Sequence, residues 1–137
     1  MEAVAAGHES MVRLLVQRGA SVSYEEPVNG RRALHLAAQH GHGLVLQALL
    51  ELGAQSDVNI PSKLGPGGGG GTALIIAADM GSSSHVEVVS LLLRTQGVDV
   101  NHATHKGVTA LFVASQGNHT TVARVLLADL RTGRCTT

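Results

Sequence analysis

Short apolar segments rich in small residues alternate along the chain with segments in which apolar residues recur at helical spacing. The short segments are 33–38, 73–78 and 110–115, and each is too short to form a stable helix without neighbours. The other segments carry the apolar sets Val12, Leu14 and Leu15; Leu46, Leu49 and Leu50; Val88, Val89, Leu92 and Leu93; and Val122, Val125 and Leu126. This spacing predicts an amphipathic second helix after each short helix.

Glycine or asparagine separates the predicted helices. The residues after the short helix are Gly7, Gly41, Gly81 and Asn118, and those after the second helix are Gly19, Gly53 and Gly97. These residue types adopt the left-handed conformation that ends a helix at little cost. Segments 57–59 and 99–101 follow with the sequence Asp-Val-Asn, and turn-rich connections of this kind predict a projecting hairpin.

The predicted helix pairs recur with a fixed period. A spacing of 34 residues separates His8 from His42 and His85 from His119. The interval from His42 to His85 is longer, and we assign the excess to two insertions. One is the serine run 82–84, expected to lengthen the turn between the paired helices, and the other is the glycine-rich segment 61–71, expected to lengthen a hairpin.

A helix, a tight turn, an antiparallel helix and a hairpin in each unit of about 33 residues resemble the ankyrin repeat. Segments 37–42, 85–93, 97–101 and 107–111 carry the resemblance, which extends over residues 3 to 130. It implies an all-α solenoid of stacked antiparallel helix pairs joined by projecting β-hairpin loops. We expect one domain, 1–137, with approximate units 1–28, 29–63, 64–104 and 105–137 and a glycine-rich insert at 61–71.

The first helices depart from the ankyrin pattern at two positions. The resemblance implies a threonine cap at the helix start, which Thr72 and Thr109 retain. Arg32 stands at the same position and has no hydrogen-bond acceptor, so we predict a weaker start for that helix. The family's motif histidine, which bonds to backbone across adjacent hairpins, is retained only as His35. Ile75 and Phe112 replace it, and we expect them to pack instead.

The amino-acid composition argues against some classes of binding partner. The chain has 137 residues, 10 Lys and Arg against 10 Asp and Glu, and two aromatic residues, which disfavours the basic surface and stacking platform of a nucleic-acid-binding protein. Neither a secretory signal nor an apolar run of about 20 residues is visible, so no membrane association is expected. We predict a cytoplasmic or nuclear location. Because neither terminal unit reads as a polar cap, we interpret the chain as a fragment of a longer array.

The glycine-rich insert before Thr72 invites comparison with a phosphate-binding loop. That motif requires a lysine directly before the serine or threonine, and Gly71 occupies the position. The dinucleotide-binding motif requires a preceding buried strand, and 61–64 is not one. We therefore interpret the insert as a flexible linker within the hairpin and predict no bound cofactor.

Eight histidines raise the question of a metal site. His40 and His42 form one close pair and His102 and His105 another, but a structural zinc site needs four ligands and Cys135 is the one thiol. The histidines, like the serines, occupy matching positions in successive units, as structural residues would. We expect neither a metal site nor an enzyme active site.

The resemblance implies binding of another protein through hairpin tips and the exposed ends of the first helices, which line a concave face. Carried over by position, the candidate residues are Glu25, Glu26, Arg31, Gln39, His40, Asp79, Met80, His105, Lys106, Val108 and Gln116. The expected function is that of a monomeric, non-enzymatic scaffold. One alternative is a regulatory or targeting segment of a larger enzyme or channel. Another is an enzyme that uses the glycine-rich loop or the histidines.

Overall fold

The computed structural model describes residues 8–19, 30–53, 58–62, 71–95, 98–100, 102–104 and 106–131. Within these ranges the chain forms seven α-helices and no β-strand. The helices are α2 (Glu9–Gln17), α3 (Ala33–His40), α4 (Gly43–Glu51), α5 (Ala73–Met80), α6 (Ser83–Arg94), α7 (Ala110–Gln116) and α8 (Thr120–Arg131). None of these helices is long and apolar enough to cross a membrane. The predicted all-α stack is confirmed.

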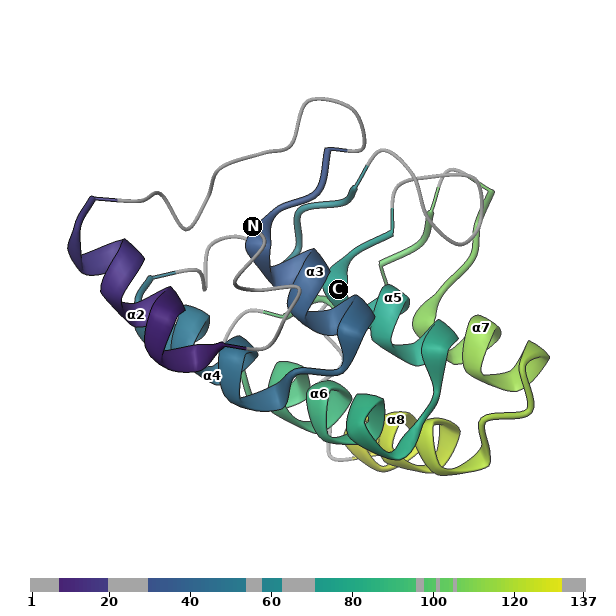
Figure 1. Cartoon of the computed structure of the whole chain (residues 1–137). Helices are drawn as coiled ribbons and strands as arrows, with labels where there is room; N and C mark the ends of the chain where they lie inside the picture. The colour runs from purple at the N-terminus through teal and green to yellow at the C-terminus, as the bar shows by residue number, and fades with distance from the viewer. Residues whose placement is uncertain are drawn as a thin grey trace.

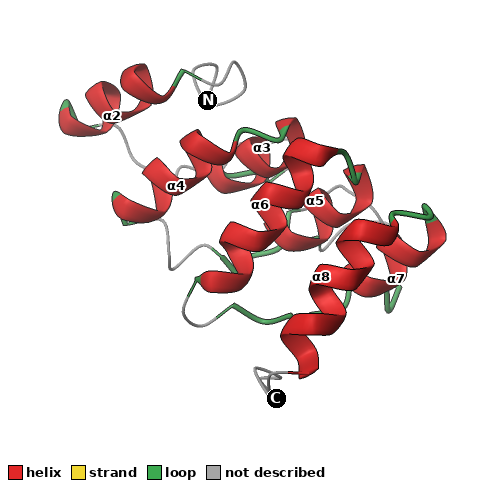
Figure 2. Cartoon of the chain, turned by 90° about the horizontal axis from the view of Figure 1, so that it is seen from below, coloured by secondary structure: helices red, strands yellow, loops and turns green. Residues whose placement is uncertain are grey.

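The helices form two layers, shown in Figures 1 and 2. The first-helix layer consists of α3, α5 and α7, and the second-helix layer consists of α2, α4, α6 and α8; neighbours within each layer are in contact. Across the layers, α3 packs against α4, α5 against α6, and α7 against α8. The described loop segments that precede the first helices rise from one edge of the stack (Figure 1).

The core lies between the two layers and continues through successive helix pairs. Leu34 and Leu74 of the first-helix layer and Leu46, Leu92 and Leu126 of the second have no more than 1% of their surface exposed. Fully buried alanines at the helix contacts are Ala37, Ala38, Ala77, Ala78 and Ala114. Such small side chains let adjacent helices approach closely, while the leucines remove apolar surface from water.

Two of the turns between paired helices require glycine, at Gly41 and Gly81, because of their backbone conformation and because of close packing. Gly41 and Gly81 have φ values of 71° and 68°, and Asn118 has a φ of 59°, so the predicted left-handed turns are confirmed at these positions. The next helix pair also packs directly against the turn. A Cβ atom at Gly81 would lie 2.2 Å from Cγ of His119, and one at Gly41 would lie 2.5 Å from Oγ of Ser84.

Threonine caps two of the first helices. Oγ1 of Thr72 accepts a hydrogen bond from the backbone N–H of Ile75 at 3.5 Å, and Oγ1 of Thr109 accepts one from Phe112 at 3.2 Å. No side-chain bond of this kind caps α3 at Arg32, as predicted. Nδ1 of His35, however, accepts a hydrogen bond from the backbone N–H of Arg32 at 2.9 Å. The reciprocal half of a capping box is thus retained.

The prediction that the serine run lengthens a turn is wrong. Helix α6 begins at Ser83, with Ser82 as its N-cap, and has 12 residues where α4 has 9. The backbone N–H of Val86 already bonds to the carbonyl of Ser82 at 2.9 Å. The inserted residues are accommodated as helix because an added turn pairs backbone groups that a longer loop would leave to solvent.

The prediction that Phe112 packs in place of the histidine hydrogen bond is also wrong. Ile75, at the matching position of α5, has 1% of its surface exposed, whereas Phe112 has 52%. The difference follows from position in the stack, because α5 has α7 beside it in the first-helix layer. Beyond α7, the described part of the chain contains no further first helix (Figure 1).

Backbone hydrogen bonds close two of the loops before the first helices. The N–H of Ser62 bonds to the carbonyl of Gly71 at 2.9 Å, joining the two sides of the glycine-rich insert, whose residues 63–70 lie outside the described ranges. In the next loop, the N–H of Thr104 bonds to the carbonyl of Val108 at 2.8 Å. These bonds agree with hairpin-like loops, although neither segment has the regular pairing of a strand.

Candidate protein-binding face

The ends of α3, α5 and α7 bring several predicted site residues to one side of the first-helix layer. We call this surface the first-helix face, comprising Arg31, Gln39, His40, Asp79, Met80 and Gln116. His40, Asp79, Met80 and Gln116 are exposed, and Gln39 and Arg31 are half-buried. Because the three helices lie side by side, the matching positions at their ends are aligned across the layer.

A hydrogen bond connects the loop part of the first-helix face to its helical part. Nη1 of Arg31, in the loop before α3, donates to Oε1 of Gln39 at the end of that helix. Arg31 forms no ion pair with a carboxylate in the described part of the chain. The guanidinium is therefore held in place by a neutral group.

His40 and His42 flank the turn at Gly41. Their imidazole rings are stacked, with centroids 5.9 Å apart and an interplanar angle of 17°. The left-handed Gly41 permits this arrangement because it reverses the chain within one residue. A flat aromatic pair thus lies at the edge of the face.

Histidines of the following helix pair hold the backbone of the first-helix face. Nε2 of His85 donates to the carbonyl oxygen of Gln39 at 2.7 Å, and Nε2 of His119 donates to the carbonyl oxygen of Asp79 at 2.9 Å. A carbonyl can only accept, so each Nε2 carries a hydrogen. On the other side of the His85 ring, Nδ1 lies 2.5 Å from Oγ of Ser82, which donates to it.

His35 forms the corresponding link at the loop edge of the stack. Its Nε2 donates to the carbonyl oxygen of Ile60 at 2.7 Å, 25 residues away in the sequence. The ring is fully buried, and its Nδ1 bonds to Arg32 as described above. The backbone-bonding role that the resemblance implied for His35 is confirmed.

The loop residues predicted to take part in binding are only partly described. Lys106 is exposed at the turn closed by the bond between Gly107 and Thr104, and Val108 is half-buried. Glu25, Glu26 and His105 lie outside the described residues. Their predicted roles are therefore untested.

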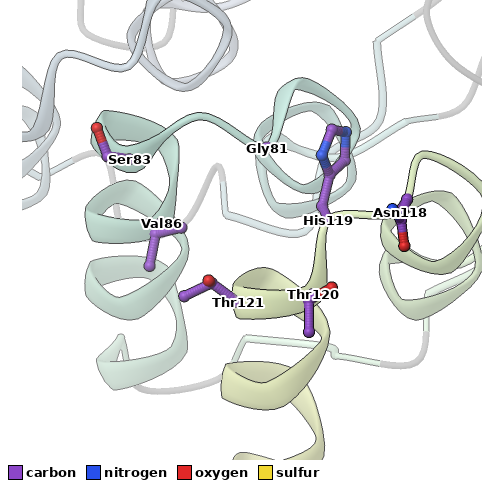
Figure 3. Close-up of a pocket in the computed structure, with 7 residues that line it drawn as sticks. All are labelled: Gly81, Ser83, Val86, Asn118, His119, Thr120 and Thr121. Carbon is purple, nitrogen blue, oxygen red and sulfur yellow. The ribbon is translucent and has the colours of Figure 1, made fainter.

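A surface depression of about 480 Å³ lies between the turns of the last two helix pairs, as Figure 3 shows. It is lined by Gly81, Ser83, Val86, Asn118, His119, Thr120 and Thr121. His119 points toward the Gly81 turn from the start of α8 (Figure 3), where its Nε2 bonds to Asp79. No carboxylate lines this depression, and the described residues hold no group of three or more His, Cys, Asp or Glu that could bind a metal ion.

An ion-pair network lies on the second-helix layer. Nε of Arg13 is 3.0 Å from Oε2 of Glu9, and its Nη2 is 2.7 Å from Oε2 of Glu51, so α2 is linked to α4. Hydrogen bonds to Glu51 and then to Glu9 raise the pKa of Arg13 above its ordinary value. The arginine is charged at neutral pH, and its share of the network is lost only as the pH rises through that raised pKa. Solvent screens this exposed network, so we assign it a small role in stability.

Comparison with known proteins identifies the family. The family model for ankyrin repeats (3 copies) matches residues 1–62 and 57–134. The chain belongs to the ankyrin-repeat family. Ankyrin repeats generally mediate protein–protein interactions.

Several relatives contain ankyrin repeats within longer chains. The chain is 28% identical over 115 residues to ankyrin repeat domain-containing protein 63 of Mus musculus, covering 84% of this chain and 27% of that protein. It is 48% identical over 81 residues to BTB/POZ domain and ankyrin repeat-containing protein NH5.2 of Oryza sativa subsp. japonica, covering 59% and 15%. Cortactin-binding protein 2 of Ornithorhynchus anatinus is 42% identical over 60 residues, covering 44% and 4%. This ankyrin chain thus spans about a quarter or less of these relatives' length.

Sequence reasoning missed the role of His85 and His119 in this ankyrin stack. Their 34-residue spacing identified them as repeat residues but did not indicate what they bind. The sequence signal that could have indicated it is that each histidine has a counterpart at the end of the first helix in the preceding unit, namely Gln39 for His85 and Asp79 for His119. It becomes meaningful only when successive helix pairs are known to stack in register.

Proposed function

We propose that this ankyrin chain is a non-enzymatic module that binds another protein through the first-helix face. The observation that carries the proposal is the way the face is built. His85 and His119 hold Gln39 and Asp79 by their backbone carbonyls, so neither of these bonds occupies a side chain of the face. Such an arrangement stabilises the surface without using the side chains that would recognise a partner.

Rigid display is the mechanism we propose for binding. Each helix pair is fixed by a buried core and by a histidine bond to its neighbour, so the face changes little when a partner binds. A preorganised surface loses little conformational entropy on association. Most of the conformational entropy lost on binding would then come from ordering of the partner.

The Ser82 and His85 pair supports a structural rather than a catalytic role for the polar groups. A nucleophilic serine needs a histidine that is oriented as its base, as a rule by a third group, beside a site for the reacting atom. His85 is 6% exposed, and its Nε2 joins two helix pairs through Gln39. In our proposal the Ser82 hydroxyl fixes the orientation of this linking ring.

A capture experiment with matched variants tests the proposal. The wild-type chain is compared with a variant in which Gln39, His40, Asp79 and Met80 are all changed to Ala, using quantitative mass spectrometry of captured proteins. The control carries alanine at four exposed positions of the second-helix layer, namely Gln47, Glu87, Arg94 and Arg124. We expect the first-helix variant to lose specific partners that the control retains. Equal capture by both variants would overturn the proposed face.

A second hypothesis is that the module directs or regulates a larger enzyme or channel. The greater length of the relatives favours this possibility, as does the name of one relative, which joins ankyrin repeats to a BTB/POZ domain. Binding through the first-helix face is common to both hypotheses. They differ in whether the chain acts alone as a monomer or as part of a longer polypeptide, which the full transcript and the mass of the native protein would establish.

A further inference from the structure

The first-helix face carries two opposite charges that are not used within the described structure. The Arg31 guanidinium contacts Gln39 but no carboxylate. The Asp79 side chain is exposed and forms no ion pair with a described cation, and its backbone carbonyl alone is engaged by His119. Among the described residues, neither charge is neutralised by an ion pair.

These charges belong to adjacent helix pairs and form no ion pair with each other. Gln39, which holds Arg31, and Asp79 occupy matching positions on α3 and α5, which pack together. Packed helices lie about 8–10 Å apart, a separation close to the screening length of about 8 Å at physiological ionic strength. A partner therefore meets a positive site and then a negative site in a fixed order along the face.

Met80 supplies an apolar contact beside the negative site. It has 47% of its surface exposed at the end of α5. Methionine has an unbranched, polarisable side chain that adapts to differently shaped apolar groups. His40, at the end of α3, is also exposed on this face.

We infer that the partner of the first-helix face is a protein segment with ordered charges. It presents an acidic side chain to Arg31, a basic side chain to Asp79 and an apolar side chain to Met80. This inference rests on the proposed function and adds the chemistry of the ligand. Of the guanidinium nitrogens of Arg31, Nη1 is bonded to Gln39 and Nε is buried, so an acidic side chain of the partner would accept a charge-assisted hydrogen bond from Nη2.

The same charges disfavour a polyanion as the partner. A nucleic-acid backbone aligned with Arg31 would bring further phosphates close to the Asp79 carboxylate, and like charges at such distances repel. Lys106 adds a positive charge at an exposed loop tip before α7, but it does not remove this repulsion. A segment with both signs of charge fits the face better than one with a single sign.

Selection from a random peptide library tests the ordered-charge inference. Phage displaying 12-residue random peptides are selected on the wild-type chain, and the affinity of enriched peptides is measured by fluorescence anisotropy. We expect enriched peptides to contain an acidic and a basic residue in a constant order. Arg31→Glu and Asp79→Lys should each weaken binding by at least about fivefold. Arg124→Glu, an exposed charge reversal on α8, should leave the affinity unchanged.

The double variant Arg31→Glu with Asp79→Lys supplies the decisive comparison. It should bind a synthetic peptide in which the acidic and basic residues are exchanged, and it should bind this peptide better than the original one. Circular dichroism and thermal unfolding verify that each variant is folded, and Arg31→Gln with Asp79→Asn provides a second pair that removes charge without reversing it. Preference of the double variant for the original peptide would overturn the inference.

The outcomes separate this inference from the proposed function. If peptides bind wild type, lose affinity for the four-alanine variant of the first-helix face and ignore both charge reversals, the face is a binding site but the inference is wrong. If no selected peptide depends on the first-helix face, both are wrong. If the peptides depend on the face and follow the charge exchange, both are supported.

Discussion

Single imidazole rings connect neighbouring helix pairs at the residue scale. His85 bonds to Gln39 across 46 residues of sequence and His119 bonds to Asp79 across 40. Each histidine lies at or near the start of a second helix and reaches the end of the first helix of the preceding unit, α3 for His85 and α5 for His119. Removal of the ring would leave a backbone carbonyl without its partner and the two pairs less tightly aligned.

His85→Ala should therefore destabilise the chain more than a matched change at an exposed histidine. The loss of a bond to a shielded carbonyl, together with the lost packing of a ring that is 6% exposed, should lower the free energy of unfolding by about 1–3 kcal/mol. His40→Ala alters an exposed ring and should have little effect. Urea denaturation followed by circular dichroism measures both. A similar stability for the two variants would contradict the anchoring role.

Gly81→Ala should be more damaging than Gly107→Ala, although both positions have similar left-handed φ values of 68° and 79°. A Cβ at Gly107 meets no atom within 4 Å, whereas one at Gly81 would lie 2.2 Å from the His119 ring. Left-handed strain should cost each variant about 1 kcal/mol, and overpacking should cost Gly81→Ala about 1–3 kcal/mol more. Equal thermal denaturation curves would show that the ring moves aside freely.

Sequence reasoning was strong for local residue properties and weak for contacts across units. The left-handed turns at Gly41, Gly81 and Asn118 followed from residue type, because few residue types adopt that conformation cheaply. The close approach of His119 to Gly81 did not follow, since it depends on how far the next helix pair slides along the stack. Spacing in the sequence does not specify that distance.

Helix starts determine how well each element of the stack is formed. Thr72 and Thr109 cap α5 and α7, whereas Arg32 offers no acceptor at the start of α3. His35 satisfies the Arg32 N–H through Nδ1 of its side chain. The element with the motif histidine is thus the one that lacks the threonine cap.

Arg32→Thr should strengthen α3 while keeping the His35 bond to the backbone of residue 32. A threonine N-cap contributes about 1 kcal/mol relative to a residue that cannot cap, so the melting temperature should rise. Thr109→Ala removes an existing cap and should lower it by a comparable amount. Differential scanning calorimetry of both variants tests the argument, and a lower melting temperature for Arg32→Thr would refute it.

The serine insertion illustrates the limit of composition at the element scale. A run of three serines is typical of a turn, yet Ser82 occupies the N-cap position of α6, without a side-chain capping bond, and Ser83 and Ser84 form its first residues. Serine favours both turns and helix N-caps, so residue type alone did not distinguish a longer turn from a longer helix. The deciding factor is tertiary, because His85 must still reach Gln39.

At the scale of the whole molecule, the position of a unit within the stack determines whether side chains at equivalent repeat positions are buried or exposed. Ile75 of α5 and Phe112 of α7 occupy matching positions. Helix α7 packs against α5, whereas no described first helix packs against the far side of α7, so Ile75 is buried and Phe112 is exposed. Stability in repeat proteins depends on interfaces between neighbouring units. Periodicity predicted the stack, but matching positions alone gave the same packing prediction for Phe112 as for Ile75.

Ile75→Ala and Phe112→Ala should consequently differ in stability by a large margin. The first removes a side chain that is 1% exposed and leaves a cavity between α5 and α7, which should cost about 2–5 kcal/mol. The second removes a side chain that is 52% exposed and should cost less than about 1 kcal/mol. Guanidinium chloride titrations compare the two, and an equal or greater loss for Phe112→Ala would show that this side chain is buried in solution.

The positions of the proposed binding face were predictable in outline, and its partner was not. Repeat positions indicated which residues reach the first-helix face, and the structure adds how Arg31, Gln39 and Asp79 are held. The fold itself specifies no ligand, because function lies in the variable residues that it displays. Only measurements on a bound partner connect those residues to a biological role.

Chemical-shift mapping of the complex tests the central claim most directly. The ¹⁵N-labelled chain is titrated with a partner protein recovered by capture, and amide signals are followed by heteronuclear correlation spectroscopy. The account predicts that the largest changes fall at Gln39, His40, Asp79, Met80 and Gln116, with little change in the exposed residues of α4, α6 and α8. Changes concentrated instead at Gln47, Glu87 and Arg94 would place the partner on the second-helix layer and contradict it.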